Sequence, residues 1–208
     1  MREKLLDTAI DHFGRLGFEG AATRAIAADA ETAMSQITYH FGGKEGLYLA
    51  CADYIASNIS GRIVPQIETL GEIDRLDAEA AAEAICMLIG VFARMMLDPA
   101  TKAYARIIAR EQQSPTDAFD RLYHGAMEPI VETAIALVRR ARPEFSEREV
   151  RATGILIWGQ AITLRTCRAS VSRVMQVDDI DAETAELLVA QLIANTRCLI
   201  TQLPEKKR

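Results

Sequence analysis

The stretch that decides the fold runs from residue 22 to residue 47 and reads ATRAIAADAETAMSQITYHFGGKEGL. Its pattern predicts two very short helices, over about Thr23–Ala30 and about Met34–His40. Thr23 is a candidate cap for the first helix, and Gly42 can adopt the left-handed conformation that ends the second. Helices this short are not stable alone, because nucleation is costly and neither buries much surface. They must therefore pack on each other and on the preceding chain.

The second short helix has an unusual outward face. Ile37 and Phe41 lie four residues apart and are expected to point inward. The outward positions are then Met34, Ser35, Gln36, Thr38, Tyr39 and His40. A short helix that presents small polar and aromatic groups without a carboxylate suits the DNA major groove. Two other interpretations stay open: a hairpin inside some all-α domain, and a packing role for Tyr39.

Several spaced sequence elements agree with a known pattern. They are Leu5-Leu6-Asp7-Thr8-Ala9, Phe13, Gly17-Phe18, Thr23-Arg24-Ala25-Ile26-Ala27, Ile37-Thr38-Tyr39-His40-Phe41-Gly42 and Lys44-Glu45-Gly46-Leu47. Together they resemble the N-terminal helix-turn-helix of the TetR/AcrR family of repressors. A shorter similarity, to the CecR-type C-terminal domain, is carried by Arg110-Glu111-Gln112-Gln113-Ser114-Pro115-Thr116, Tyr123-His124 and Pro129. The resemblance implies an all-α fold of about nine helices. Residues 1–48 would form a three-helix helix-turn-helix DNA-binding domain, and residues 49–208 a larger effector-binding and dimerisation domain.

The resemblance also assigns DNA contacts. Second-helix contact positions are matched by Thr23 and Arg24, base-facing positions by Met34, Ser35, Gln36 and Thr38, and backbone-contacting positions by Tyr39, His40 and Lys44. Gln36 is the best candidate for base readout, because an amide can donate to and accept from adenine together. Three positions depart from the family pattern: Glu31 in the turn, Ala33 before the recognition helix, and Thr38. A non-glycine residue in a left-handed turn costs about 1 kcal/mol, and alanine provides no cap.

Charge argues against a nucleic-acid partner. The net charge of the 208 residues is −5, and the first 48 residues carry five basic and seven acidic side chains, a balance of −2. A broad basic patch is therefore absent, so DNA binding would depend on local placement of helix N-termini and a few side chains. Four well-separated cysteines, no signal-peptide pattern and no run of 18 apolar residues indicate a soluble, cytoplasmic protein without a membrane partner.

Beyond residue 48 the apolar periodicity predicts further helices. They cover about 44–63 (kinked or ended by Pro65), 78–97, 100–112, 117–142 (interrupted by Pro129), 147–174 and 182–202, after a first helix at 2–17. The charged tail at 205–208 is expected to be disordered. The last two helices carry apolar stripes that suggest a homodimeric four-helix bundle. The stripes could equally face the monomer's own core. The family resemblance favours the dimer, which would read an inverted repeat about one helical turn apart.

The sequence contains no enzyme constellation, metal-ligand pair or cofactor motif, so we expect no catalysis, no metal and no cofactor. An effector pocket is expected among the helices of residues 80–170. Candidate walls are Phe92, Met95, Met96, Tyr104, Tyr123 and Trp158, and candidate polar anchors are Arg106, Glu111, His124, Gln160 and Arg165. The resemblance implies a dimeric transcriptional regulator, expected to be a repressor, that binds an operator and is released by a small molecule. The alternative is an all-α ligand-binding or protein-interaction module with lost or weak DNA binding.

Overall fold

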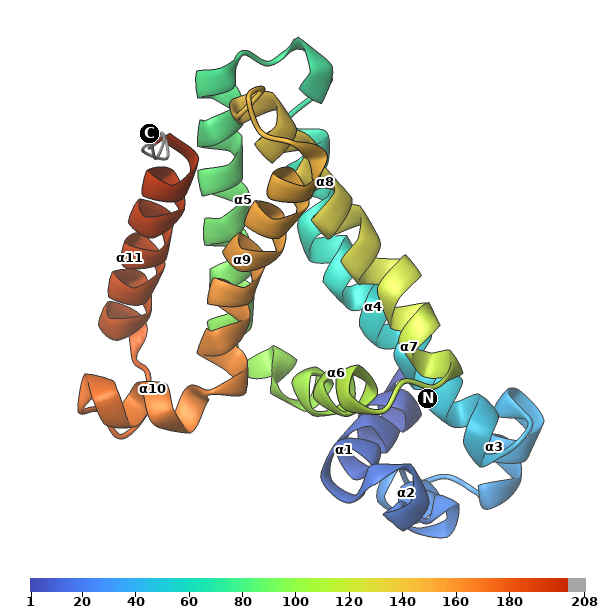
Figure 1. The fold of residues 1–208 in the computed structure, drawn as a ribbon. Helices are drawn as coiled ribbons and strands as arrows, with labels where there is room; N and C mark the ends of the chain where they lie inside the picture. Colours follow the sequence, from blue (N-terminus) through green and yellow to red (C-terminus); the bar gives the residue numbers. More distant parts are fainter. Residues whose placement is uncertain (202–208) are drawn as a thin grey trace. The chain divides into compact units, whose positions relative to one another are not determined.

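The computed structural model describes residues 1–201, and within that range the chain is helical with no strand (Figure 1). The charged tail expected to be disordered lies outside the described residues. The described residues form two compact units: unit 1 comprises residues 1–61 and 99–128, and unit 2 comprises residues 62–98 and 129–201. The all-α expectation is confirmed.

Unit 1 begins with the three helices that the sequence pattern predicts. They are α1 (Arg2–Gly20), α2 (Thr23–Asp29) and α3 (Met34–Phe41). Gly17 has φ 76° and breaks α1 at the residue where the sequence predicts its end. The first part of α4 (Lys44–Glu68), then α6 (Lys102–Gln113) and α7 (Asp117–Leu122), complete the unit. Its core contains the fully buried side chains of Leu6, Ile10, Phe13, Ile26, Ile37, Leu47, Ile55, Ile107 and Leu122.

Unit 2 is a bundle built around α5 (Ala78–Leu97), which packs against both α9 (Glu147–Thr166) and α11 (Ala182–Thr201). It also contains α8 (Glu128–Ala141) from Pro129 onward and α10 (Arg168–Met175). By length and composition α5 could cross a membrane. However, 61% of its most apolar window is buried, which is the pattern of a core helix and makes the membrane signal weak.

Three sequence-based boundaries need correction. Helix α4 continues through Pro65 to Glu68, because the proline removes one backbone donor without ending the apolar stripe that buries Ile63. The helix expected over 117–142 is divided by a π-helical turn at Tyr123–Met127, just before Pro129. The helix expected over 147–174 is divided at Cys167, whose φ and ψ of −107° and 26° are not helical.

Candidate functional site

The helix-turn-helix is held together by a few apolar residues. Helix α2 buries Ile26 and Ala27, and α3 buries Ile37, with Gly42 at φ 75° ending α3 as predicted. The expectation that Thr23 caps α2 is wrong, since Ala22 occupies the cap position and no side chain bonds there. The predicted fold of this segment therefore rests on apolar packing and not on capping.

The outward face of α3 is open to solvent. Tyr39 is 82% exposed and Met34 50% exposed, while Ser35, Thr38 and His40 are also exposed. This exposure does not support a packing role for Tyr39. Gln36 is half-buried, and its Oε1 lies 3.1 Å from Nε2 of His40. No carboxylate belongs to α3, so this face can approach phosphates and base edges without direct repulsion from its own helix.

Three further predicted DNA contacts lie outside α3, on α2 and α4. Lys44 begins α4, donates from Nζ to the backbone oxygen of Glu19 at 3.1 Å, and lies 4.8 Å from the ring centroid of Phe18. Arg24 is exposed on α2 and Thr23 is half-buried. Lys44 is thus held near the end of α3 by contacts with α1, an arrangement that suits a fixed phosphate contact.

The turn between α2 and α3 contains a non-glycine residue in a left-handed backbone conformation, as the sequence predicts. Glu31 has φ 55°, a left-handed conformation that glycine adopts more easily, and Ala33 caps α3 without a side-chain hydrogen bond. Lys4 donates to the Glu31 carboxylate at 2.5 Å, and both side chains are largely exposed. Exposed ion pairs contribute little, so this contact does not offset the conformational cost.

We therefore expect Glu31→Gly to raise the free energy of unfolding by up to about 1 kcal/mol, measured by urea denaturation. Glu31→Ala is the matched control, because it removes the same ion pair and keeps a side chain at positive φ. If the glycine variant is no more stable than the alanine variant, the turn is not strained.

A buried carboxylate, that of Glu111, holds the start of α4 next to the helix-turn-helix. Glu111, at the end of α6, is 2% exposed and accepts a hydrogen bond from the Tyr48 hydroxyl at 2.6 Å. It also accepts from the backbone nitrogen of Thr116 at 3.0 Å and from its Oγ1 at 2.9 Å. The Tyr48 ring in turn lies edge-on to Phe13 and Phe18. Glu111, which the sequence predicts as an effector anchor, therefore already accepts hydrogen bonds from other residues of unit 1.

Helix α6 also packs closely on α1. A Cβ at Gly17 would lie 2.8 Å from Nη1 of Arg110, and a Cβ at Gly14 would lie 3.3 Å from Cβ of Arg106. Arg106 also approaches Asp11 at 3.8 Å. Glycines at these positions allow the Arg106 stem and the Arg110 guanidinium to approach the α1 backbone, so α6 packs directly on α1 within unit 1.

Burial raises the pKa of Tyr48 well above its ordinary value, and the hydrogen bond to Glu111 adds to the shift. The folded state therefore retains this proton more strongly than the unfolded state, and the resulting stability is complete below about pH 10 and is lost at higher pH. We expect Tyr48→Phe to make the free energy of unfolding fall less steeply above pH 10. Parallel alkaline slopes for the two proteins, measured by denaturant titration, would contradict this.

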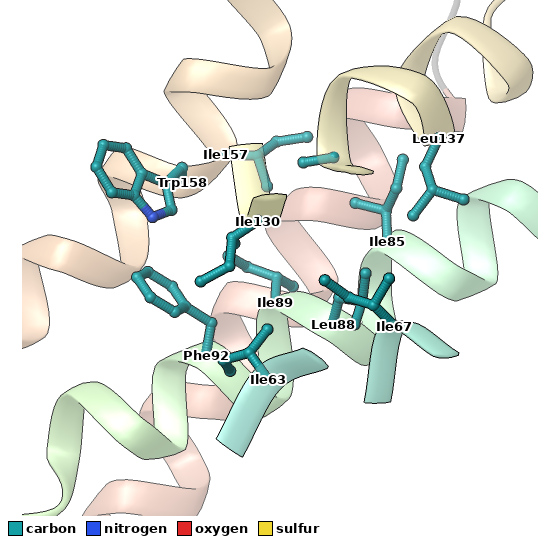
Figure 2. Close-up of a pocket in the computed structure, with 11 residues that line it drawn as sticks. Ile63, Ile67, Ile85, Leu88, Ile89, Phe92, Ile130, Leu137, Ile157 and Trp158 are labelled. Carbon is teal, nitrogen blue, oxygen red and sulfur yellow. The ribbon is translucent and has the colours of Figure 1, made fainter. Parts of the chain in front are cut away.

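A separate, apolar cavity lies within unit 2 (Figure 2). It contains about 440 Å³ of space not filled by atoms, its open mouth included. It is lined by the end of α4, by α5, by α8 and by α9, with the residues Ile63, Ile67, Ile85, Leu88, Ile89, Phe92, Ile130, Ala134, Leu137, Ile157 and Trp158. The wall is almost entirely apolar, a composition typical of small-molecule sites.

Two of the predicted effector residues, Phe92 and Trp158, line this cavity, with ring centroids 6.2 Å apart. The other predicted contacts do not. Tyr104, Glu111 and Tyr123 belong to unit 1, and so do Arg106 and His124. Met95, Met96, Gln160 and Arg165 belong to unit 2 but are not among the lining residues. Arg165 is buried and donates to the backbone oxygens of Met95 and Asp98.

Among the described residues 1–201, no group of three or more histidine, cysteine or acidic side chains could hold a metal ion.

The sequence matches two family models. Residues 5–51 match the one described as "Bacterial regulatory proteins, tetR family", and residues 81–203, more than half of the chain, match "HTH-type transcriptional dual regulator CecR, C-terminal domain". The chain belongs to the TetR family.

Two curated relatives agree with this assignment. The TetR-family chain is 35% identical over 135 residues to the HTH-type transcriptional dual regulator CecR of Shigella flexneri, an alignment that covers 62% of this chain and 59% of that protein. It is 33% identical over 93 residues to the HTH-type transcriptional regulatory protein RaaS of Mycobacterium tuberculosis, covering 45% of this chain and 43% of that protein. These matches span about half of each relative's length. The family and these relatives are transcriptional regulators and not enzymes.

Solved structures share the fold at low identity. FadR of Bacillus subtilis, solved with stearoyl-CoA, has a TM-score of 0.65 at 16% identity and covers 98% of this chain and 100% of its own. AibR, solved with isovaleryl coenzyme A and operator DNA, has a TM-score of 0.70 at 12% identity and covers 93% and 96%. A TetR-family regulator from Mesorhizobium loti has a TM-score of 0.62 at 14% identity and covers 95% and 94%.

Sequence reasoning missed most of the cavity wall in this TetR-family regulator. Helical periodicity marks the isoleucines and leucines of α4, α5 and α8 as inward-facing, but it does not separate a cavity wall from a filled core. It also missed Arg2, which lies 5.8 Å from the Phe41 ring centroid and shares a surface hollow with Gln36 and His40. Arg2 lies before Leu5, the first buried residue of α1, so helical periodicity gives no signal for its position.

Proposed function

We propose that this TetR-family protein is a homodimeric repressor that binds an inverted-repeat operator and is released by a small molecule. The observation that supports DNA reading best is the exposed, carboxylate-free face of α3, from Met34 to Tyr39, followed by the tethered Lys44. Thr23, Arg24, Met34, Ser35, Gln36, Thr38, Tyr39, His40 and Lys44 are the proposed contacts. We further propose a cytoplasmic location with no cofactor and no catalysis.

The proposed dimer uses exposed faces of α9 and α11. The stripe predicted on the last helix largely faces the bundle core, since Val189, Leu192, Thr196 and Ile200 are buried. A second set of apolar side chains is 46–65% exposed and comprises Ile155, Leu156, Leu187 and Leu199. Because α9 and α11 contact each other, these exposed side chains can form one surface. A second copy of the chain would cover it and give a four-helix interface.

Helix α4 provides the proposed link between effector and operator. Ile63 and Ile67, near its end, line the unit 2 cavity, whereas Leu47 and Tyr48, near its start, are buried in unit 1. A ligand that binds better to one position of this helix would shift the population of reading and non-reading states. The ligand can act only through that difference in affinity. We propose repression because the family resemblance is to repressors. Transcription from the neighbouring promoter, measured with and without the protein, shows whether the protein represses or activates.

The reading helix is tested by Gln36→Ala and Tyr39→Ala. Each is expected to weaken binding to the promoter DNA beside the protein's own gene by about tenfold, since a lost base or backbone contact costs about 1–3 kcal/mol. Fluorescence anisotropy with labelled promoter DNA measures the affinity. Ser57→Ala, at an exposed position of α4, is the control. Unchanged affinity in both Gln36→Ala and Tyr39→Ala would defeat the assignment.

A second candidate function is an all-α ligand-binding or protein-interaction module that no longer binds DNA. The acidic balance of the first 48 residues, the strained Glu31 and the uncapped Ala33 favour it. A salt titration separates the two. A DNA-binding protein loses affinity linearly on a log–log plot as salt rises, because bound phosphates release counterions.

A further inference from the structure

The cavity in unit 2 has an unusually uniform wall. Its lining side chains are those of isoleucine, leucine, alanine, phenylalanine and tryptophan, and none of them is ionisable. The indole Nε1 of Trp158 is the single polar side-chain atom among them. A ligand in this cavity would therefore meet hydrocarbon on almost every side.

The wall differs from one end to the other. Figure 2 shows Phe92 and Trp158 together at one end and Ile67, Leu88 and Leu137 at the other. The two aromatic rings are nearly parallel, with an interplanar angle of 27°. Branched aliphatic side chains lie between the ends. Such a wall suits an aromatic ring with an aliphatic substituent, because flat rings stack well on flat rings and branched chains fill irregular space.

On the helices that line the cavity, Arg62, Arg94 and Arg165 are paired with groups outside its wall. Arg62 pairs with the Asp98 carboxylate at 2.5 Å, and Arg94 forms a two-contact pair with Glu186. Arg165 donates to backbone oxygens at the end of α5. A ligand carboxylate or phosphate inside the cavity would thus lose its hydration and gain no counter-ion among the lining residues.

We infer that this cavity selects an uncharged hydrocarbon body, of the alkyl-substituted aromatic class, and rejects a charged group within it. The inference rests on the proposed function, in which this cavity holds the effector. Affinity then comes from apolar surface removed from water and needs no ion pair. Any charged portion of an effector would have to lie outside the cavity.

Trp158 gives a direct test, because it is the one tryptophan in the chain and lies in the wall. The full-length protein is titrated, without DNA, with two neutral probes, toluene and isobutylbenzene, and with their charged counterparts, 4-methylbenzoate and 4-isobutylbenzoate. We expect a saturable change in Trp158 emission with a neutral probe, and affinity at least tenfold weaker for its carboxylate. Equal or tighter binding of the carboxylates, or no saturable change with either neutral probe, overturns the inference.

A variant that fills part of the cavity tests whether the neutral probes bind there. Ala134→Leu adds a larger side chain to the wall and is expected to weaken isobutylbenzene binding at least tenfold. Ala78→Leu makes the same change at an exposed position of α5 and should leave binding unchanged. Wild-type affinity in Ala134→Leu, with an unchanged thermal melt, would overturn the location. If Ala134→Leu does not fold, the comparison of neutral and charged probes on the wild-type protein still decides the selectivity.

Failure of this inference and failure of the proposed function give different results. The fluorescence titration contains no DNA, so a neutral-selective signal supports the cavity chemistry whether or not the protein binds an operator. If isobutylbenzene binds selectively but leaves promoter affinity unchanged, the cavity chemistry holds and its role as the effector site fails.

Discussion

Replacing Glu111 with alanine is expected to lower the free energy of unfolding by about 3 kcal/mol. The substitution leaves the Tyr48 hydroxyl and both the backbone nitrogen and the hydroxyl of Thr116 without their present acceptor. Glu111 itself is 2% exposed, so water cannot readily replace the lost bonds. Because a domain of this size is stable by roughly 5–15 kcal/mol, the effect is a large fraction of the total.

Urea denaturation followed by circular dichroism measures this change. Glu111→Gln keeps one oxygen acceptor in nearly the same volume and should cost about half as much. Glu128→Ala is the matched control, since that carboxylate accepts from exposed His124 at 2.8 Å and is itself only half-buried. The control is expected to change stability by no more than about 0.5 kcal/mol. Similar losses for Glu111→Ala and Glu128→Ala would show that the buried carboxylate has no special role.

Local sequence patterns predict several helices of this fold, but they do not predict the contacts of Glu111. Repeated apolar spacing predicts a helix over residues 78–97, and these are the bounds of α5 in the structure. The capping box between Ser146 and Glu149 joins residues three apart, a spacing that a local sequence pattern can reveal. The contact between Tyr48 and Glu111 joins residues 63 apart in the sequence, so no local pattern could reveal it.

The candidate site divides in the same way. The outward positions of α3 follow from a helical period and one buried anchor, Ile37, so their exposure could be predicted. The cavity combines residues from four helices, and its empty space depends on how those helices pack, which composition does not encode. Polar residues such as Glu111 and Arg165 were attractive as ligand anchors, but each satisfies other polar groups within its own unit.

Replacing Leu156 with glutamate is expected to dissociate the proposed dimer and to weaken promoter binding by about 100-fold or more. Leu156 is 65% exposed on α9, and in the proposed interface it would be covered by the second copy. A carboxylate buried there without a partner opposes association. A monomer then binds each half-site separately and loses the gain from linked binding, which is typically about 10²–10⁴.

Sedimentation equilibrium measures the association, and anisotropy with promoter DNA measures the binding. Val174→Glu is the control, because it makes a similar change at a 78% exposed position of α10, outside the exposed face of α9 and α11. If Leu156→Glu stays dimeric, the interface lies elsewhere on the chain. If it becomes monomeric but binds the promoter as tightly as wild type, the two reading helices do not act together. In that case the operator would not need to be an inverted repeat, because a single α3 face would account for the affinity.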